Sequence, residues 1–243
     1  MRILAIVVGA LGGMLADGAR ECGMRNWECG MPGSAFIPHS AFHIPNLTIA
    51  RLHYDGGGDW YANPSSLPNL LRAIRTRTGL ATAERERVVT LESPQLWSTP
   101  YLYMTGHGNV RFSDEQAKVL RRYLEQGGFL HADDNYGMDR AFRREMARVF
   151  PDRPLVEVPL THPIYHIVYD FPDGVPKIHE HDGERAQGFG IVLGGRLVVY
   201  YSYQSDLGDG WEDASVHDDP PELREAALRM GVNLFAYAVS VVP

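Results

Sequence analysis

From about residue 44 the sequence alternates strand and helix patterns joined by short connections. Runs rich in β-branched and aromatic residues predict strands at "LTIARLHY" (47–54), "RVVTLE" (87–92), "YLYM" (101–104) and "FLHA" (129–132). Between them, "SSLPNLLRAIRTRTG" and "SDEQAKVLRRYLEQGG" space their apolar residues three and four apart and stop at glycine, as helices do. This alternation predicts a mainly parallel sheet with helices on both faces.

The second half of the chain completes this pattern. A helix that begins with Asp139 as its cap is followed by a short strand, "LVEV" (155–158). The stretch "GFGIVL-GG-RLVVYYSY" predicts an antiparallel hairpin, and "PPELREAALRMGVNLFAYAVS" predicts a closing helix. We therefore expect a single α/β domain over residues 47–243. It should be a three-layer sandwich with a flavodoxin-like, mainly parallel sheet and a late antiparallel hairpin.

The first 18 residues, "MRILAIVVGALGGMLADG", have the pattern of a signal peptide. One basic residue precedes an apolar run that is too short to span a bilayer but has the length of a secretory h-region. Ala16 and Gly18 are small residues at the positions that a signal peptidase needs. We expect a signal peptide over 1–18 and an N-terminal extension over 19–46. The mature chain should have no transmembrane span and should be exported to the periplasm or the extracellular face.

A cytoplasmic alternative remains open for the same segment. Gly9, Gly12 and Gly13 could form the phosphate loop of a nucleotide-binding protein, but that loop requires a helix after it. Instead, "ECGMRNWECGMPGSAF" follows, without helical periodicity. In an exported protein Cys22 and Cys29 could close a small disulfide loop, and the sequence leaves this pairing undecided.

The net charge bears on the class of partner. With 23 basic and 30 acidic residues the chain carries a net charge of −7. It therefore lacks the positive excess that non-specific binding to phosphate backbones requires. We expect no nucleic-acid partner.

Polar residues gather in the loops that follow the predicted strands. The ends at which parallel strands finish lie at one edge of the sheet, called here the carboxyl edge, and ligands bind there. The residues expected to bind a ligand at this edge are Asp55, Gly57, Asp59, Trp60, Thr105, Gly106, His107, Gly108, Asp133, Asp134 and His162. If the strand "LVVYYSY" is parallel as well, Asp206, Asp209 and Trp211 join them. The alternative is a purely structural role, in which the glycines form tight turns and His107 is a turn residue without a catalytic or binding function.

These side chains suit metal-assisted or acid–base chemistry better than acyl transfer. The turn "TGHGN" lies where a nucleophile elbow would lie, but it holds no Ser or Cys. The catalytic candidates are His107, Asp133 and Asp134, and the candidate ligands for a divalent metal are His107, Asp133 and His162. The run "HEHD" (179–182) is interpreted as a pair of imidazoles on one face of a surface strand.

Several blocks of the sequence together resemble a bacterial family catalogued as domain-of-unknown-function family 4159. They are "RLHYDGGGDWYANPSSLPNLLRAI", "YLYMTGHGNVRFSDEQAKVLRRYLEQGGFLHADDNYGMDRAFRREMARVFP", "LTHPIYH" and "REAALRMGVNLFAYA". The resemblance covers about residues 47–239 and implies a fold similar to that of class I glutamine amidotransferases. Those enzymes carry a Cys on the elbow, so "TGHGN" argues against amidotransferase activity. The resemblance also implies an association with envelope proteins, which agrees with export.

Two functions follow as expectations. The first is an exported binding module of the bacterial cell envelope, or a subunit of a membrane-attached assembly, whose degenerate amidotransferase-like site holds an envelope protein or a carbohydrate. The alternative is a metal-assisted hydrolase that acts on a carbohydrate or peptidoglycan-like substrate. In that enzyme His107, Asp133 and Asp134 would be ligands or acid and base, and Asp55 and Asp59 would position the substrate.

Overall fold

The computed structural model describes residues 47–240. The predictions for the first 46 residues, namely the signal peptide, the alternative phosphate loop and the Cys22–Cys29 disulfide, lie outside the described residues. Within the described range, no helix combines the length and the apolar character needed to cross a membrane.

A seven-stranded sheet forms the middle layer. Its strands are β1 (Ile49–Leu52), β2 (Arg87–Val89), β3 (Tyr101–Gly106), β4 (Phe129–Asp134), β5 (Val156–Glu157), β6 (Gln187–Leu193) and β7 (Arg196–Tyr203). The order across the sheet is β2-β1-β3-β4-β7-β6-β5. The strands β2, β1, β3, β4 and β7 pair in parallel, whereas β6 is antiparallel to both β7 and β5. The predicted parallel sheet with a late hairpin is confirmed.

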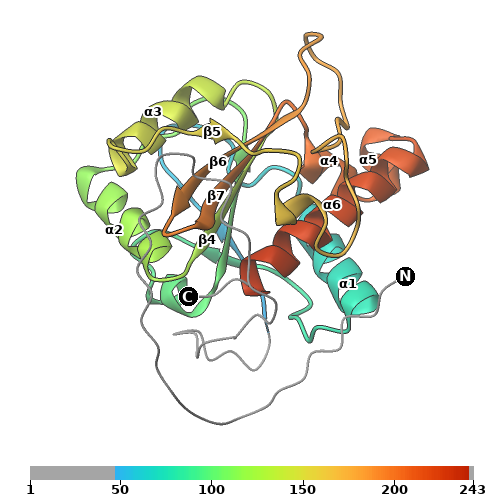
Figure 1. Ribbon diagram of the computed structural model, residues 1–243, viewed down its shortest axis with the longest axis horizontal. Helices are drawn as coiled ribbons and strands as arrows, with labels where there is room; N and C mark the ends of the chain where they lie inside the picture. The colour runs from blue at the N-terminus through green and yellow to red at the C-terminus, as the bar shows by residue number, and fades with distance from the viewer. Residues whose placement is uncertain (1–46, 241–243) are drawn as a thin grey trace, which may run out of the picture. The chain divides into compact units, whose positions relative to one another are not determined.

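Helices cover both faces of this sheet, as Figure 1 shows. On one face lie α2 (Asp114–Glu125) and α3 (Asp139–Val149). On the other lie α1 (Ser66–Thr78), the short α4 (Leu207–Trp211) and the long α6 (Pro221–Ser240), with α5 (Ala214–His217) before α6. Two 3₁₀ turns, η1 (Pro94–Ser98) and η2 (Pro163–Tyr165), complete the elements. The result is a three-layer α/β sandwich.

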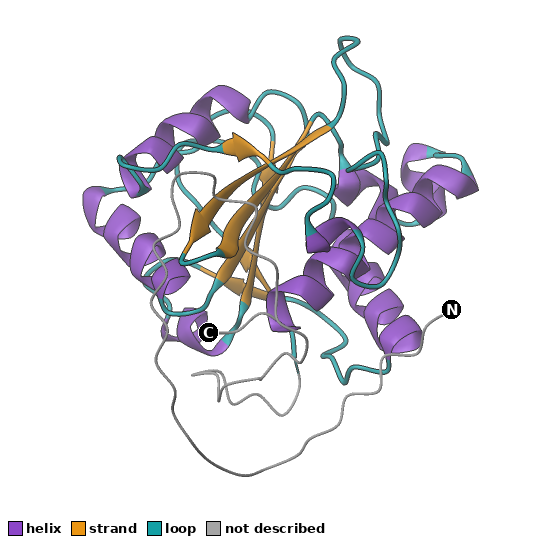
Figure 2. Cartoon of the chain, in the orientation of Figure 1, coloured by secondary structure: helices purple, strands orange, loops and turns teal. Residues whose placement is uncertain are grey.

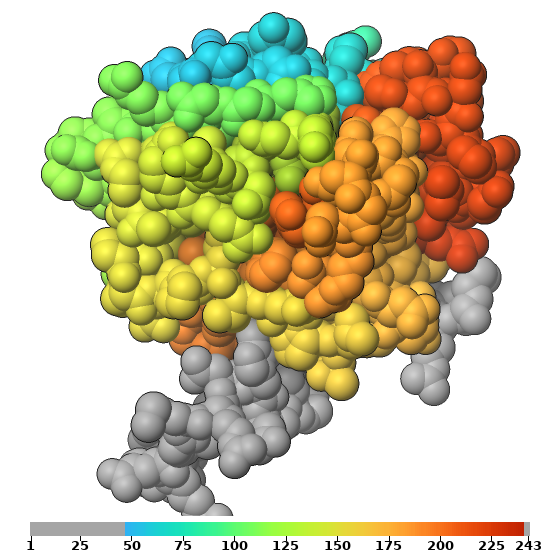
Figure 3. All heavy atoms as spheres, turned by 90° about the horizontal axis from the view of Figure 1, so that it is seen from above, coloured from blue at the N-terminus to red at the C-terminus, as the bar shows by residue number. Residues whose placement is uncertain are grey.

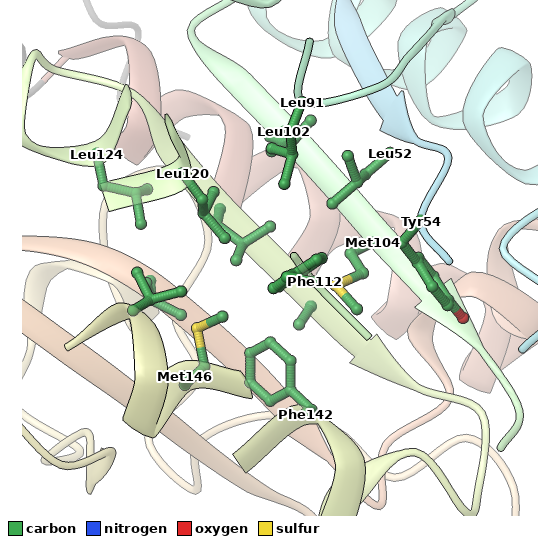
Figure 4. Packing of buried hydrophobic residues seen from close by; sticks show 14 of the residues in the cluster. Leu52, Tyr54, Leu91, Leu102, Met104, Phe112, Leu120, Leu124, Phe142 and Met146 are labelled. Carbon is green, nitrogen blue, oxygen red and sulfur yellow. The ribbon is translucent and has the colours of Figure 1, made fainter. Parts of the chain in front are cut away.

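The alternation of side chains along the central strands produces two separate cores. In β3, Leu102 and Met104 pack towards α2 and α3, while Tyr101 and Tyr103 pack towards α1 and α6. Figure 4 shows the first of these cores, in which Phe142 and other apolar side chains of the two helices meet the sheet. Because strands buried on both faces lose their polar alternation, β3 and β4 are fully buried along their length.

Local signals set the helix boundaries, with one correction. The capping box between Ser113 and Gln116 is present at the start of α2, as the sequence predicts. The cap of α3 is Met138 rather than Asp139, which is the first helical residue. The amide of Met138 donates to Asp134, because β4 runs two residues further than predicted and carries its last carboxylate to the helix.

The order in which successive strands are added to the sheet reverses between β1 and β3, and this place is called here the reversal point. From β1 the chain passes through α1 to β2 on one side, and β3 then pairs with β1 on its other side. In open α/β sheets the loops diverge at such a point and leave room for a ligand at the carboxyl edge. The loops after β1 and β3 are those that carry Asp59 and His107.

Residues 171–186 form an irregular segment between η2 and β6, seen in Figure 2 as the long teal loop at the top of the view. The predicted surface strand at "HEHD" is therefore wrong, since His179 and His181 lie on this irregular segment. Contacts with the residues after β7 hold it in place. The amide of Ile178 donates to the carbonyl of Ser205 at 2.9 Å, and the Ser205 hydroxyl donates to the carbonyl of Pro176 at 2.6 Å.

Candidate functional site

The two loops at the reversal point are joined by backbone hydrogen bonds. The Arg111 amide donates to the carbonyl of Asp55 at 2.7 Å, and the Gly58 amide donates to the carbonyl of Asn109 at 3.0 Å. The side-chain amide of Asn109 also donates to the carbonyl of Gly56. The loops after β1 and β3 therefore form one continuous surface.

Close packing at this junction requires glycine. Gly106 has a φ of +139°, and a Cβ there would lie 2.4 Å from the Tyr54 hydroxyl. At Gly58 a Cβ would lie 2.8 Å from the carbonyl oxygens of both His107 and Asn109. Gly57 and Gly108 also have positive φ, but both are exposed and face open space. Two of the glycines thus permit close backbone contact, and two serve the turns.

Asp59 holds His107 by two contacts. One carboxylate oxygen accepts a hydrogen bond from the His107 amide, and the other lies 2.9 Å from the ring Nδ1. The His107 side chain is 57% exposed and that of Asp59 is 34% exposed. Burial acts to raise the pKa of Asp59, but the hydrogen bonds and the charge of His107 outweigh it and lower that pKa. The imidazole is thus exposed and held in place.

The two aromatic residues that follow Asp59 in the chain, Trp60 and Tyr61, differ in exposure. The Trp60 ring is partly buried and stacks on His53, with the ring centroids 4.1 Å apart. Tyr61 meets the edge of Trp60 at 5.6 Å and is 65% exposed. Of the two rings, Tyr61 is therefore the more available for stacking on a ligand.

Asp133 lies beneath the carboxyl edge and is fully buried. Its oxygens accept hydrogen bonds from the Ser202 hydroxyl at 2.5 Å, from the amides of Leu207 and Gly208 at 3.2 and 2.6 Å, and from Tyr103 at 3.4 Å. Burial raises the pKa of Asp133 to about 7, and the bonds from Ser202 and Gly208 act in the opposite direction. Donors occupy both oxygens, so Asp133 ties β4 to β7 and α4.

Asp134 and Thr105 are buried as well. Burial raises the pKa of Asp134, while the Met138 amide and the charge of His107 lower it, so Asp134 lies within electrostatic range of the exposed imidazole. The Thr105 hydroxyl donates to the side-chain oxygen of Asn135 at 3.1 Å and has no exposure. Neither side chain is presented to a ligand directly.

Sequence reasoning missed a buried polar chain under Asp133. His131 lies between Tyr101, whose hydroxyl is 2.9 Å from Nδ1, and Ser202, whose hydroxyl is 2.9 Å from Nε2. Burial lowers the pKa of His131 to about 3, so its imidazole is neutral at ordinary pH. The available signal was a histidine inside the apolar run "FLHA", which has to find partners because it cannot reach water.

The loop after β7 carries a second polar group at the carboxyl edge, because β7 is parallel to β4. Asp206 has a φ of +57° and no exposure, and its Oδ2 lies 2.7 Å from Nε2 of His181. Burial, followed by the nearby Asp133 and Asp209, raises the pKa of Asp206 to about 9. The ring of Tyr136 stacks on His181 at 4.6 Å.

Four further residues form what is called here the histidine–aspartate cluster: His179, Asp209, His217 and Asp219. His179 Nδ1 is 2.9 Å from Asp209 Oδ2, and its Nε2 is 2.6 Å from Asp219 Oδ1. His217 Nε2 is 3.8 Å from Asp209 Oδ1. Figure 3, a view from above, shows the orange segment that carries His179 beside the red C-terminal part of the chain that includes α5. Among residues 47–240, His179, Asp209 and His217 are the set whose ligand atoms all lie within 4.8 Å of one another.

The structure separates the three metal ligands expected from the sequence. His107 contacts Asp59 and is exposed, whereas Asp133 is buried beneath the edge. His162 caps η2 and packs on Tyr237, whose hydroxyl accepts from the amide of Leu197 at the beginning of β7. His162 thus lies near the opposite end of the sheet from the carboxyl edge, and placing it there was wrong. The loop after β5 runs across α6 instead of staying at that edge.

Trp211 is part of the core on the α6 side. It is fully buried, and its indole N–H donates to the carbonyl of Ala227 at 2.8 Å. Asp209, in the same short helix α4, instead belongs to the histidine–aspartate cluster and accepts a hydrogen bond from the Asn63 side chain at 2.5 Å. The sequence predicts that both residues follow β7 at the carboxyl edge, but it does not show that Trp211 packs in the core while Asp209 joins the histidine–aspartate cluster.

Two adjoining hollows lie beside the joined loops. One, of about 600 Å³, is lined by Asn109, Arg111, Phe112, Ser113, Asp114, Arg144, Glu145 and Arg148. The other, of about 520 Å³, is lined by Asp55, Gly56, Glu92, Arg111, Ser113 and Gln116. They share Arg111 and Ser113 and combine cationic, anionic and neutral hydrogen-bonding groups.

A comparison with known families extends over most of the chain. The model of one family, described as a domain of unknown function (DUF4159), matches residues 48–239. No curated protein matches the chain.

Proposed function

The chain belongs to the DUF4159 family, and from that premise we propose that its α/β domain is an exported binding module of the bacterial cell envelope. Its ligand site is the surface formed by the loops after β1 and β3. The ligand is a polar, hydroxyl-rich molecule of the carbohydrate class.

The observation that carries this proposal is the pair of contacts between Asp59 and His107. They engage the backbone and Nδ1 of the histidine, while Nε2 makes no hydrogen bond to any part of the chain that the structure describes. A group held in place before binding loses little conformational freedom on binding, so its hydrogen bond contributes more of its strength to affinity. An exposed imidazole fixed between two glycines therefore suits ligand recognition.

The surroundings of His107 support a sugar-like ligand. Tyr61, two residues after Asp59 in the same loop, exposes its ring, and aromatic faces stack on the apolar faces of sugars. The adjoining hollow presents the carboxylates of Asp55 and Glu92, the guanidinium of Arg111 and the amide of Gln116. Donors and acceptors in such a mixture match hydroxyl groups better than they match a ligand with a single strong charge.

The same loops favour binding over acyl transfer. The turn 105–109 holds one hydroxyl, that of Thr105, and this group is buried and donates to Asn135. Hydrolysis by Asp133 and Asp134 is supported less well, since both carboxylates are buried and donors occupy both oxygens of Asp133. Export and attachment to the envelope rest on the pattern of residues 1–18 and on the family resemblance. Mass spectrometry of the mature N-terminus together with cell fractionation tests them.

Ligand binding is tested by titrating the protein with soluble peptidoglycan fragments and with neutral oligosaccharides in a calorimeter. At least one of these probes should bind, and His107→Ala and Asp59→Asn should each weaken it by about 10-fold, the cost of one good hydrogen bond. The matched control is His166→Ala, which removes another exposed histidine paired with an aspartate, Asp170, away from these loops. If no probe binds, or if His107→Ala binds as tightly as the control, the carbohydrate site is excluded.

A further inference from the structure

We propose that His179, Asp209 and His217 hold one divalent transition-metal ion of the zinc class, with Asp219 as the outer carboxylate that orients His179. Asp209 lies on α4, His217 on α5 and His179 on the irregular segment 171–186. These ligands differ from the set expected from the sequence, namely His107, Asp133 and His162. The inference stands independently of the proposed carbohydrate site.

The spacing of the three side chains matches a zinc site. Two ligand atoms that lie about 2.0–2.1 Å from one zinc ion at the tetrahedral angle are about 3.3 Å apart. The distances from His179 Nδ1 to Asp209 Oδ2, 2.9 Å, and from His217 Nε2 to Asp209 Oδ1, 3.8 Å, lie on either side of that value, and one ligand atom from each of the three residues lies within 4.8 Å of the other two. The rings of His179 and His217 meet edge to face, with centroids 5.1 Å apart, so both can turn a nitrogen towards the carboxylate. Small rotations of the side chains are enough to bring the three atoms around one ion.

The two carboxylate contacts of the His179 ring supply the second argument. A neutral imidazole has one N–H donor and one lone pair, and both of its nitrogens here face carboxylates. If Nε2–H donates to Asp219, the lone pair of Nδ1 points at an oxygen of Asp209, and two acceptors repel. A metal ion between Nδ1 and Asp209 removes this repulsion. The arrangement of carboxylate, histidine and metal is the usual way in which proteins orient a metal-bound imidazole.

The burial of Asp219 is an independent observation that favours a cation at this site. Its side chain is 6% exposed, and its Oδ2 has no hydrogen-bond partner among the described residues. A buried carboxylate oxygen that has no hydrogen-bond partner is costly unless a cation lies nearby. A divalent ion on the far side of His179 offsets the charge of both Asp209 and Asp219.

The proposed metal site is partly exposed to solvent. The His179 and His217 side chains are 24% and 28% exposed, whereas Asp209 is 11% exposed. The Asn63 amide donates to Asp209 Oδ1 and fixes the carboxylate from the protein side. Three protein ligands with one open side is the pattern of zinc sites that keep a water molecule or a substrate atom as the fourth ligand. Two imidazoles also select zinc-like ions over Mg²⁺ and Ca²⁺, which prefer oxygen.

The test uses the full chain, stripped with a chelator and then titrated with Zn²⁺. We expect one Zn²⁺ per chain by elemental analysis after desalting, no comparable retention of Mg²⁺ or Ca²⁺, and a visible Co²⁺ spectrum of the tetrahedral type. His217→Ala removes a ligand from the exposed helix α5 and should weaken Zn²⁺ binding by more than the roughly 10- to 100-fold that loss of an outer-sphere partner costs. Asp219→Asn should weaken binding within that range.

The control is again His166→Ala, which removes a histidine–aspartate pair that has no third ligand and should leave Zn²⁺ binding unchanged. If the wild-type chain retains no Zn²⁺, the metal site is excluded. It is equally excluded if His217→Ala binds Zn²⁺ like the control. Should His217→Ala fail to fold, Asp219→Asn decides, because unchanged affinity in that variant overturns the assigned arrangement.

Discussion

Asp59 accepts a hydrogen bond from the backbone amide of His107 with one oxygen and lies against the ring Nδ1 of the same residue with the other. One carboxylate from the loop after β1 thereby sets both the main chain and the side chain of a residue in the loop after β3. The pair lies at the reversal point, where the order of the strands across the sheet changes direction, and α/β folds place their ligands at such points.

The pKa of Asp59 should rise when the imidazole is removed. In the wild type the bonds and charge of His107 hold this pKa below its ordinary value although burial acts against them. In His107→Ala the bond from the ring and its charge are lost, while the amide bond remains. NMR titration of the side-chain carboxyl carbon should therefore show Asp59 protonating at a higher pH in the variant. An unchanged titration would mean that the ring does not contact Asp59 in solution.

Alanine should be tolerated very differently at the two glycines that flank His107. Gly106→Ala places a Cβ 2.4 Å from the Tyr54 hydroxyl in a strained backbone conformation and should cost about 3 kcal/mol or more of unfolding free energy. Gly108→Ala has the same kind of backbone strain but open space around it, so about 1 kcal/mol is expected. Urea unfolding of the two variants measures the difference. Equal losses would show that the contact with Tyr54 is not the cause.

Removing the Asp133 carboxylate should destabilise the domain. In Asp133→Ala the buried amides of Leu207 and Gly208 and the hydroxyl of Ser202 lose their acceptor, and each unpaired donor costs about 1–3 kcal/mol. We expect a loss of about 3 kcal/mol or more in urea unfolding. Asp55→Ala, which removes an exposed carboxylate from the same edge, should stay within about 0.5 kcal/mol of the wild type. Similar stability of the two variants would contradict the role given to Asp133.

His131 should make the domain sensitive to acid. Its pKa is lowered to about 3 in the folded state from about 6.5 in the unfolded state, so only the unfolded chain takes up the proton between these values. Stability from this residue is complete above pH 6.5 and is lost as the pH falls towards 3. Asp133, whose pKa is raised to about 7, acts oppositely: its contribution falls as the pH rises from about 4 to 7.

A variant separates the two effects. His131→Gln keeps a donor and an acceptor for Tyr101 and Ser202 but does not titrate. Between pH 6.5 and pH 4 it should lose about 3 kcal/mol less stability than the wild type, the equivalent of about two pKa units. Thermal or urea unfolding of both proteins across this pH range measures the difference. Parallel pH profiles would show that His131 is not neutral in the folded protein.

The fold was predictable because its signals are local. The apolar spacing of 65–79 and the capping box at Ser113 act within a few residues, and they fix the helices α1 and α2. The glycine pair between β6 and β7 likewise predicts the hairpin. Besides the strand wrongly predicted at "HEHD", the limits of elements differed. At β4, Asp133 and Asp134 extend the strand because Ser202, Leu207 and Met138 supply donors for them.

The site was predictable in part, because the carboxyl ends of parallel strands lie at one edge of the sheet regardless of the conformation of the loops that follow them. That rule placed Asp59, His107 and Asp209 at one edge. It failed for His162, since the loop after β5 leaves the edge and packs along α6. It also could not show that His179 and His217 meet at Asp209, because an irregular segment and a one-turn helix carry no period that fixes their direction.

The pairing of β4 with β7 has a consequence for the time at which this domain can form. Leu130 of β4 pairs with Val199 of β7. The strand β4 therefore lacks its second neighbour in the sheet until the ribosome has synthesised the chain through β7. Contacts between distant parts of a sequence form late and slowly. A nascent chain of this kind therefore cannot complete its central sheet until most of the domain has been synthesised.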